Sequence, residues 1–360
     1  MRRVLVRPVS RVVLTVLSVA LPGACEPSPA VDAMNAMELM PEDLADTGLY
    51  ADLPGQVIAD GVLAFEPQYP LWTDGAAKRR WIRLPAGGAI DARDPDHLVF
   101  PVGTRLWKEF SLERRIETRM STLARDGWHF AVYRWSADER SATLAPECGV
   151  RAACESAPGV PYDVPGRADC LACHAAGPDA VLGFTPLQLS ADRDPLAPHA
   201  QPLPAGAVDL DELVRRRLVR NLPEPLVATP PRIEAASPRE RAVLGYLNAN
   251  CGMCHSSTGR LAGLGLDLSY SLARPGERPA IATTLARPSH FRGHGEDDPR
   301  RIAPAAADLG VLPRRMGSRQ ALAQMPPLGT HRPDAEALEL LTTWIRTDLA
   351  AGQSVATNAF

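Results

Sequence analysis

The chain has 360 residues, a formal net charge of −3, 45% hydrophobic residues and 22% charged residues. This balance excludes a wholly disordered chain and a polytopic membrane protein, and the near-neutral charge argues against a nucleic-acid partner. The length predicts about two domains. The seven cysteines are an odd number, so each of them needs an explanation.

Residues 1–25 have the pattern of an export signal peptide. Two arginines near the N-terminus precede a mostly apolar stretch, 9–21, that is too short to span a membrane comfortably. Small residues before Cys25 resemble a lipobox, in which the cysteine is lipidated, although Pro22 stands where leucine is usual. Cleavage without lipidation is the alternative. We therefore expect a periplasmic protein, as a lipoprotein held to a membrane or as a free one, with 26–48 as a linker.

Residues 49–165 predict a mostly antiparallel β domain. Five of the six tryptophans lie here, and segments such as 128–135 alternate with a period close to two. Asp126 and Gly127 are residue types of a tight hairpin turn, which would join 112–123 to the segment that follows. Tryptophans in such a domain are more often buried than exposed, but an exposed cluster would indicate a module that binds a carbohydrate or a partner dehydrogenase.

Helices and proline-rich connections are predicted after residue 165. Residues 209–221 place apolar side chains at helical spacing. Residues 237–240 have the pattern of a capping box, with proline at the first helical position of a helix that ends near Cys251. A further amphipathic helix is predicted to begin at Pro333 and to continue to about residue 349.

Four cysteines form two identical C-x-x-C-H motifs, at 170–174 and 251–255. This is the attachment signature of c-type haem, because two thiols at this spacing reach two vinyl groups on one porphyrin edge and the adjacent histidine becomes the proximal iron ligand. Zinc ribbons also pair C-x-x-C motifs, but usually only ~15–20 residues apart. The motifs predict two covalently bound haems, attached through Cys170, Cys173, Cys251 and Cys254 and ligated by His174 and His255.

The two remaining cysteines, Cys148 and Cys154, lie close together in a segment rich in proline, glycine and alanine. In an oxidising compartment a short-loop disulfide is the simplest interpretation. A reactive thiol pair is the alternative, but nothing in the local sequence would activate a thiol.

The order of features over 237–350 resembles class I cytochrome c: a helix, a haem motif, loops, Met-Pro and a terminal helix. The resemblance implies that His255 is the proximal ligand of the second haem and Met325 its distal ligand. A thioether is a soft ligand that favours Fe(II) and raises the potential. Met316 and His331 are the competing candidates nearby.

Most of the chain also resembles an uncharacterised family of exported di-haem c-type proteins. The matching segments are 69–76, 78–82, 100–104, 107–110, 167–170 and 182–189. The resemblance implies an architecture and no activity. We expect a multidomain α+β protein, in which the β domain at 49–165 precedes a first haem segment at 166–236 and an α-helical cytochrome c-like domain at 237–360.

The distal ligand of the first haem is the least defined part of this prediction. No Met-Pro segment follows His174 before the second motif, so His199, His129, Met120 or no residue at all would fill the position. Two fully ligated haems predict an electron carrier between a periplasmic donor and acceptor protein, with no catalytic residue. An open iron position predicts instead a haem enzyme, such as a peroxidase or an oxidase.

Overall fold

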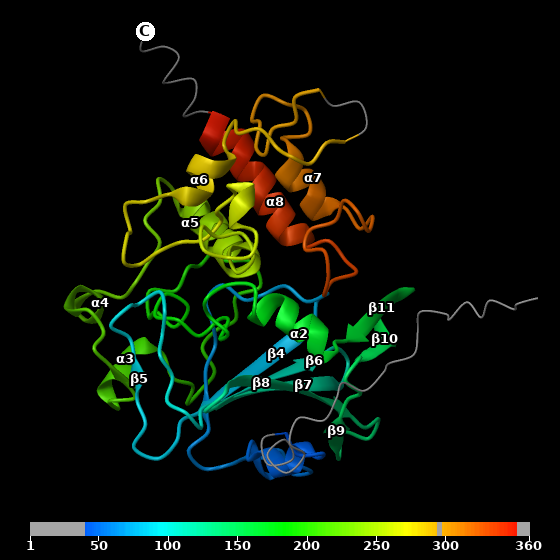
Figure 1. Ribbon diagram of the computed structural model, residues 1–360, viewed down its shortest axis with the longest axis vertical. Helices are drawn as coiled ribbons and strands as arrows, with labels where there is room; N and C mark the ends of the chain where they lie inside the picture. The colour runs from blue at the N-terminus through cyan, green and yellow to red at the C-terminus, as the bar shows by residue number, and fades with distance from the viewer. Residues whose placement is uncertain (1–39, 294–296, 351–360) are drawn as a thin grey trace, which may run out of the picture.

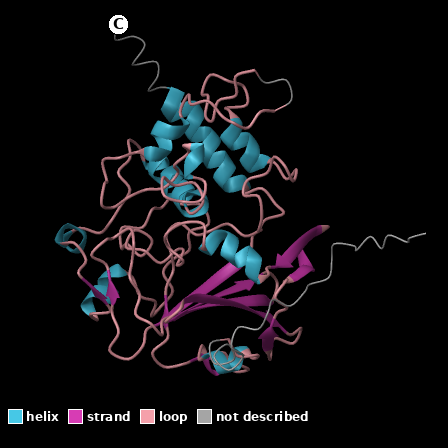
Figure 2. Ribbon diagram, in the orientation of Figure 1, coloured by secondary structure: helices cyan, strands magenta, loops and turns pink. Residues whose placement is uncertain are grey.

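The computed structural model describes residues 40–293 and 297–350, and its architecture is α+β (Figures 1 and 2). A six-stranded antiparallel sheet lies in the N-terminal part, and most of the helices form a group in the C-terminal part. The predicted signal peptide, the lipidation candidate Cys25 and the linker as far as residue 39 lie outside the described residues. No helix within the described residues combines the length and the apolar character needed to cross a membrane.

The large sheet has the strand order β3-β4-β6-β7-β8-β9, and all neighbouring strands are antiparallel. Ala124 pairs with Gly127, so a two-residue turn joins the longest strands and the predicted hairpin is confirmed. The strands are β3 (Leu63–Ala64), β4 (Ala77–Arg83), β6 (Arg105–Ser111), β7 (Arg115–Ala124), β8 (Gly127–Trp135) and β9 (Ala142–Leu144).

One face of this sheet packs against the segment that precedes it. The segment contains η1 (Leu44–Thr47), β1 (Tyr50–Asp52) and β2 (Val57–Ile58). Leu44 is fully buried in a cluster with Trp107 of β6. Residues 40–48, predicted as the end of a linker, therefore include part of the core of the β region.

Besides the antiparallel pair of β1 and β2, two small sheets accompany the large one, and the first of them corrects a predicted helix. β12 (Val219–Arg220) pairs in parallel with β5 (Ile90–Asp91). The helix predicted over 209–221 is therefore wrong in its second half: α3 (Leu210–Arg215) ends where Arg217 adopts a φ of 59°, and the chain then joins a strand.

The second small sheet pairs β10 (Val150–Ala157) with β11 (Val160–Val164), and it separates the two cysteines predicted to form a disulfide. Cys148 lies outside the strand, beside the backbone of Gly166, whereas Cys154 lies within it opposite Tyr162. Both cysteines are unbonded in the structure, as are the four cysteines of the motifs, so the disulfide stays a prediction.

The C-terminal part is a group of helices around a shared apolar core (Figure 1). Its helices and helical turns are α5 (Pro238–Leu247), η2 (Asn248–Gly252), η3 (Ala262–Leu264), α6 (Pro279–Thr284), α7 (Val311–Gly317), α8 (Ala335–Trp344) and η4 (Ile345–Leu349), with α4 (Glu224–Ala228) in the connection that leads to them. The predicted capping of α5 is confirmed, since the Ser237 hydroxyl accepts a hydrogen bond from the Glu240 N–H at 3.0 Å. α8 packs across α5 and begins two residues after the predicted Pro333.

Candidate functional site

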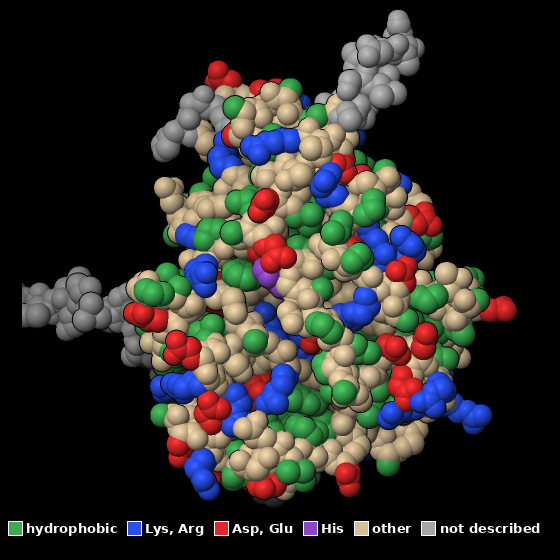
Figure 3. Space-filling view, turned by 180° about the vertical axis from the view of Figure 1, so that it is seen from behind, with side chains coloured by type: hydrophobic (Ala, Val, Ile, Leu, Met, Phe, Trp, Pro, Cys, Tyr) green, Lys and Arg blue, Asp and Glu red, His purple; other side chains and the backbone are tan. Residues whose placement is uncertain are grey.

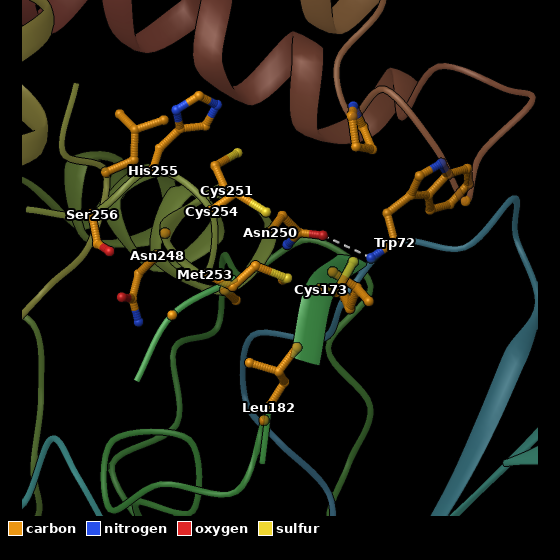
Figure 4. A pocket seen from close by; sticks show the side chains of 18 of the residues that line it. Trp72, Cys173, Leu182, Asn248, Asn250, Cys251, Met253, Cys254, His255 and Ser256 are labelled. Carbon is orange, nitrogen blue, oxygen red and sulfur yellow. Dashed lines mark hydrogen bonds between the residues drawn. The ribbon is translucent and has the colours of Figure 1, made fainter. Parts of the chain in front are cut away.

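One cavity of about 1050 Å³ lies between the sheet and the helical group, and both C-x-x-C-H motifs line it. This volume is at the upper end of the ~300–1,000 Å³ that is usual for ligand and cofactor sites. Figure 4 shows Cys173 from the first motif and Cys251, Met253 and Cys254 from the second around a common space. The fold therefore brings together two motifs that are far apart in the sequence.

The first motif lies on α2 (Arg167–His174), which packs on β8 of the sheet. α2 begins at Gly166, whose N–H donates to the Asp169 carboxylate at 3.0 Å. A Cβ on Gly166 would meet the Cys148 backbone at 2.6 Å, so this close approach requires glycine. Cys170 is buried among apolar side chains of the sheet, which anchors the motif there.

The imidazole of His174 is held in the orientation that a metal ligand requires. Its Nδ1 lies 2.6 Å from the carbonyl oxygen of Ala180, and its ring packs on Phe130 with centroids 4.7 Å apart. An Nδ1–H that donates to a carbonyl leaves Nε2 free to bind a metal. Burial lowers the pKa of His174 to about 4, so the ring is neutral at physiological pH and able to act as a ligand.

The second motif lies where α5 passes into the π-helical turn η2. The His255 N–H donates to the Cys251 carbonyl at 2.8 Å, which places the histidine directly after the turn. Burial is the main cause of a lowered pKa for His255, which favours the neutral ring. Its Nδ1 is buried without a hydrogen-bond partner in the described part of the chain, and a buried polar atom of this kind requires a ligand or another partner.

The two motifs are direct neighbours within the cavity. The Arg260 N–H, beyond the second motif, donates to the Ala176 carbonyl just after the first at 2.9 Å. A Cβ on Gly177 would lie 3.3 Å from the Met253 carbonyl oxygen. Groups attached to the two motifs would therefore share one interior space.

Met325 lines this cavity from the loop that follows α7. Its N–H donates to the Arg315 carbonyl of α7 at 2.9 Å, and its side chain is half-buried. The two competing residues also line the cavity. Met316, however, is buried in the helical core, and His331 places Nε2 3.1 Å from the Asp163 carboxylate.

None of the three candidate distal ligands of the first haem lines the cavity, and an absent ligand was the fourth alternative. His199 has Nε2 2.8 Å from Asp334 and Nδ1 3.1 Å from Glu336, so carboxylates occupy both ring nitrogens. His129 contacts Asp126 in the hairpin turn at 2.9 Å. Met120 is 1% exposed in the core on the other face of the sheet.

The segment 69–75 connects the β region to both sides of the second motif. The Trp72 N–H donates to the Asn250 side chain at 2.8 Å, next to Cys251 (Figure 4). The buried Asp74 carboxylate accepts hydrogen bonds from the N–H groups of His331 and Arg332 at 2.8 and 2.9 Å, and these residues follow the Met325 loop. Sequence reasoning recognised this segment only as a family resemblance and not as a support of the site.

A row of basic side chains on the sheet was also missed by sequence reasoning. Arg80, Lys108 and Arg119 line the cavity wall opposite the helical group. The available signal was the scarcity of lysine: Lys78 and Lys108 are the only lysines of the chain, and both lie on strands of this sheet.

The face of the molecule drawn in Figure 3 does not share this basic character. Figure 3 shows basic and acidic side chains scattered together over one face of the molecule, in keeping with the near-neutral net charge. The five tryptophans of the β region do not form an exposed cluster that could serve as a binding surface. Trp81, Trp107 and Trp135 are buried, and the half-buried Trp72 and Trp128 pack on His199 and Phe100.

Among the residues that the structure describes, no group of three or more His, Cys, Asp or Glu side chains is arranged to hold a metal ion. Such a group is what the zinc alternative needs. Comparison of the chain with protein-family models, curated proteins and solved structures found no match.

Proposed function

We propose that the chain is an exported di-haem c-type cytochrome that transfers electrons between periplasmic partner proteins. The observation that carries the proposal is that both C-x-x-C-H motifs, 170–174 and 251–255, line one cavity of about 1050 Å³. When bound, each haem supplies a one-electron couple, and the protein sets its orientation, ligands and surroundings.

The side chains of each motif have separate tasks in this proposal. The two thiols of a motif hold one porphyrin edge by thioether bonds. The Ala180 carbonyl orients His174, so that its Nε2 is presented to the iron. At the second motif His255 and Met325, on the loop after α7, would hold the iron.

The arrangement of the C-terminal part supports a cytochrome c-like character there. A helix delivers the second motif, a loop carries Met325, and α8 packs across α5. Contacts between the two motif segments, through Ala176 and Arg260, support a relay in which an electron passes from one haem to the other. Lipid anchoring at Cys25 stays a prediction.

The test is a haem count combined with a redox titration of the purified full-length protein expressed with the c-type haem assembly machinery. We expect two covalently bound haems per chain in a pyridine haemochrome assay and two one-electron transitions. A reproducible count below two would overturn the proposal.

A second candidate is a haem enzyme of the peroxidase or oxidase type, with an open iron position at the first haem. The observation that favours it is that His199, His129 and Met120 all lie outside the cavity. The spectrum of the ferric protein distinguishes the two functions. A high-spin component that binds cyanide rapidly supports the enzyme, whereas an entirely low-spin protein supports the carrier.

A further inference from the structure

The cavity-facing side of the sheet carries four basic side chains in adjacent positions. Lys78 and Arg80 lie on β4, Lys108 on β6 and Arg119 on β7. The strand register places Arg80 opposite Lys108, and Lys108 opposite Arg119. Three strands therefore present one continuous row of positive charge beside the first motif.

Two members of the row have carboxylate partners. Arg80 donates to both carboxylate oxygens of Glu66 at 2.8 Å. Arg119 donates to Glu117 at 2.6 and 3.1 Å. The charges of these two guanidinium groups are therefore balanced by the protein itself.

The Lys108 ammonium is different, because no hydrogen bond or ion pair joins it to any residue that the structure describes. Its Nζ lies 5.3 Å from the centroid of the Phe110 ring, and its side chain lines the cavity. Burial, followed by the charges of Arg80 and Lys78, lowers the pKa of Lys108 well below its usual value. An unpaired ammonium in an interior site is unfavourable unless an anion accompanies it.

Packing places Lys108 near the first motif rather than the second. Phe110, which lies under the Lys108 ammonium, belongs to the same buried cluster as Cys170 of α2. The propionates of a haem lie on the porphyrin edge opposite its thioether bonds. A haem attached at Cys170 and Cys173 would therefore direct its two carboxylates away from the thiols and into the cavity that Lys108 also lines.

We propose that Lys108 binds a carboxylate inside the cavity, and that this carboxylate is a propionate of the haem at the first motif. The inference rests on the proposed function, because the haem supplies the carboxylate. A positive charge at this place disfavours the ferric state, which carries one more positive charge than the ferrous state, and so raises the potential of the first haem.

The test compares three substitutions in the full-length holoprotein. Lys108→Met removes the charge and Lys108→Arg keeps it. Arg105→Met removes a charge from the opposite face of the same strand, where Arg105 donates to the Thr47 carbonyl at 2.8 Å. Each protein is assayed for haem content and for the midpoint potentials of both haems.

We expect two haems per chain in all variants and a lowered midpoint potential for one haem in Lys108→Met. The potential should return in Lys108→Arg and stay unchanged in Arg105→Met. Unchanged potentials in Lys108→Met with two haems present would overturn the inference alone. Fewer than two haems in the unsubstituted protein would overturn the proposed function and this inference together.

A second measurement distinguishes the propionate from a free anion. Azide and formate are titrated into the unsubstituted protein and into Lys108→Met. Equal affinities, together with the shifted potential, support the propionate. A loss of anion affinity in Lys108→Met without a shifted potential would assign Lys108 to a free small anion and would overturn the propionate assignment.

Discussion

The two C-x-x-C-H segments have the same residue pattern and very different surroundings. The first lies on the short helix α2, against an antiparallel sheet, and its His174 has a carbonyl partner at Nδ1. The second follows α5 within the helical group, and its His255 has a buried Nδ1 without a partner in the described residues. Burial is the main cause of a lowered pKa for both histidines, and the charges of Lys108 and Arg119 lower the pKa of His174 further, whereas those of Arg315 and Arg301 do so for His255.

This difference shows which properties a local motif determines and which it does not. The motif sets the spacing of the thiols and the position of the histidine, so it predicts attachment equally well at both places. In the proposed cytochrome, residues distant in sequence would form the opposite side of each iron. The two haems would therefore differ in ligation and potential although their motifs match.

The largest expected effect comes from removing the thiols of one motif at a time. Cys170→Ser with Cys173→Ser should reduce the covalent haem content from two per chain to one, because a serine hydroxyl does not form the thioether. Cys251→Ser with Cys254→Ser should do the same and leave the other haem. A pyridine haemochrome assay gives the count, and the surviving redox transition identifies the haem.

The two cysteines outside the motifs provide the matched control for this experiment. Cys148 and Cys154 belong to neither C-x-x-C-H motif, so replacing both with serine should leave two haems per chain. A motif variant that kept both covalent haems would contradict the assignment of that motif.

The next effect concerns the second segment alone. Met325→Leu should remove the thioether ligand and produce a high-spin component in the absorption spectrum. It should also lower the midpoint potential of one haem by roughly 0.1–0.2 V, which is a fraction of the ~0.8 V range that different axial ligands produce. Absorption spectra and a potentiometric titration measure both changes. Met316→Leu is the control: it conserves volume in the core and should cost less than about 1.5 kcal/mol with both potentials unchanged.

The comparison also indicates how much the sequence could predict. The hairpin of β7 and β8 and the cap at Ser237 were predicted correctly, because residues within a few positions of one another determine both. The antiparallel sheet followed from period-two alternation in the same way. Local signals thus accounted for the α+β class, and they are also the source of the proposed attachment residues.

The failures all involve partners that are distant in the chain. The helix predicted over 209–221 was shortened because Val219 pairs with Ile90 of another segment. The contact of His199 with Asp334, the N-cap residue of α8, is likewise invisible in the local sequence. The proposed role of Lys108 depends on strand register, which places it beside Arg80 and Arg119 and which no single segment specifies.

A smaller effect tests whether the β region supports the second segment specifically. Asp74→Asn replaces one carboxylate oxygen with an NH₂ group, which donates hydrogen bonds and cannot accept them from the N–H groups of His331 and Arg332. The loss should destabilise the protein by about 2 kcal/mol. Asparagine tolerates the positive φ of 48° at this position, so the backbone itself is preserved. Loss of stability is measured by denaturant unfolding, with the exposed Asp60→Asn as control.

The spectroscopic consequence of Asp74→Asn should be unequal between the haems. His331 and Arg332 follow the Met325 loop, so methionine ligation should be lost at a lower temperature than in the unsubstituted protein. The first haem should keep its spectrum over the same range. Equal changes at both haems would mean that Asp74 supports the whole fold and not the second segment.

The smallest effect concerns the helix that delivers the second motif. Ser237→Ala removes the cap of α5 and the hydroxyl that donates to Asp348 in η4, so it should cost about 1 kcal/mol or slightly more. Asp209→Ala removes an equivalent cap from α3, where the carboxylate accepts a hydrogen bond from the Glu212 N–H at 2.8 Å, and is the matched control.

Both losses of stability should appear in denaturant unfolding, but only Ser237→Ala should make ligation by Met325 more sensitive to heat. α3 contributes to neither motif, whereas α5 and the terminal helix pack together around the core that positions Cys251.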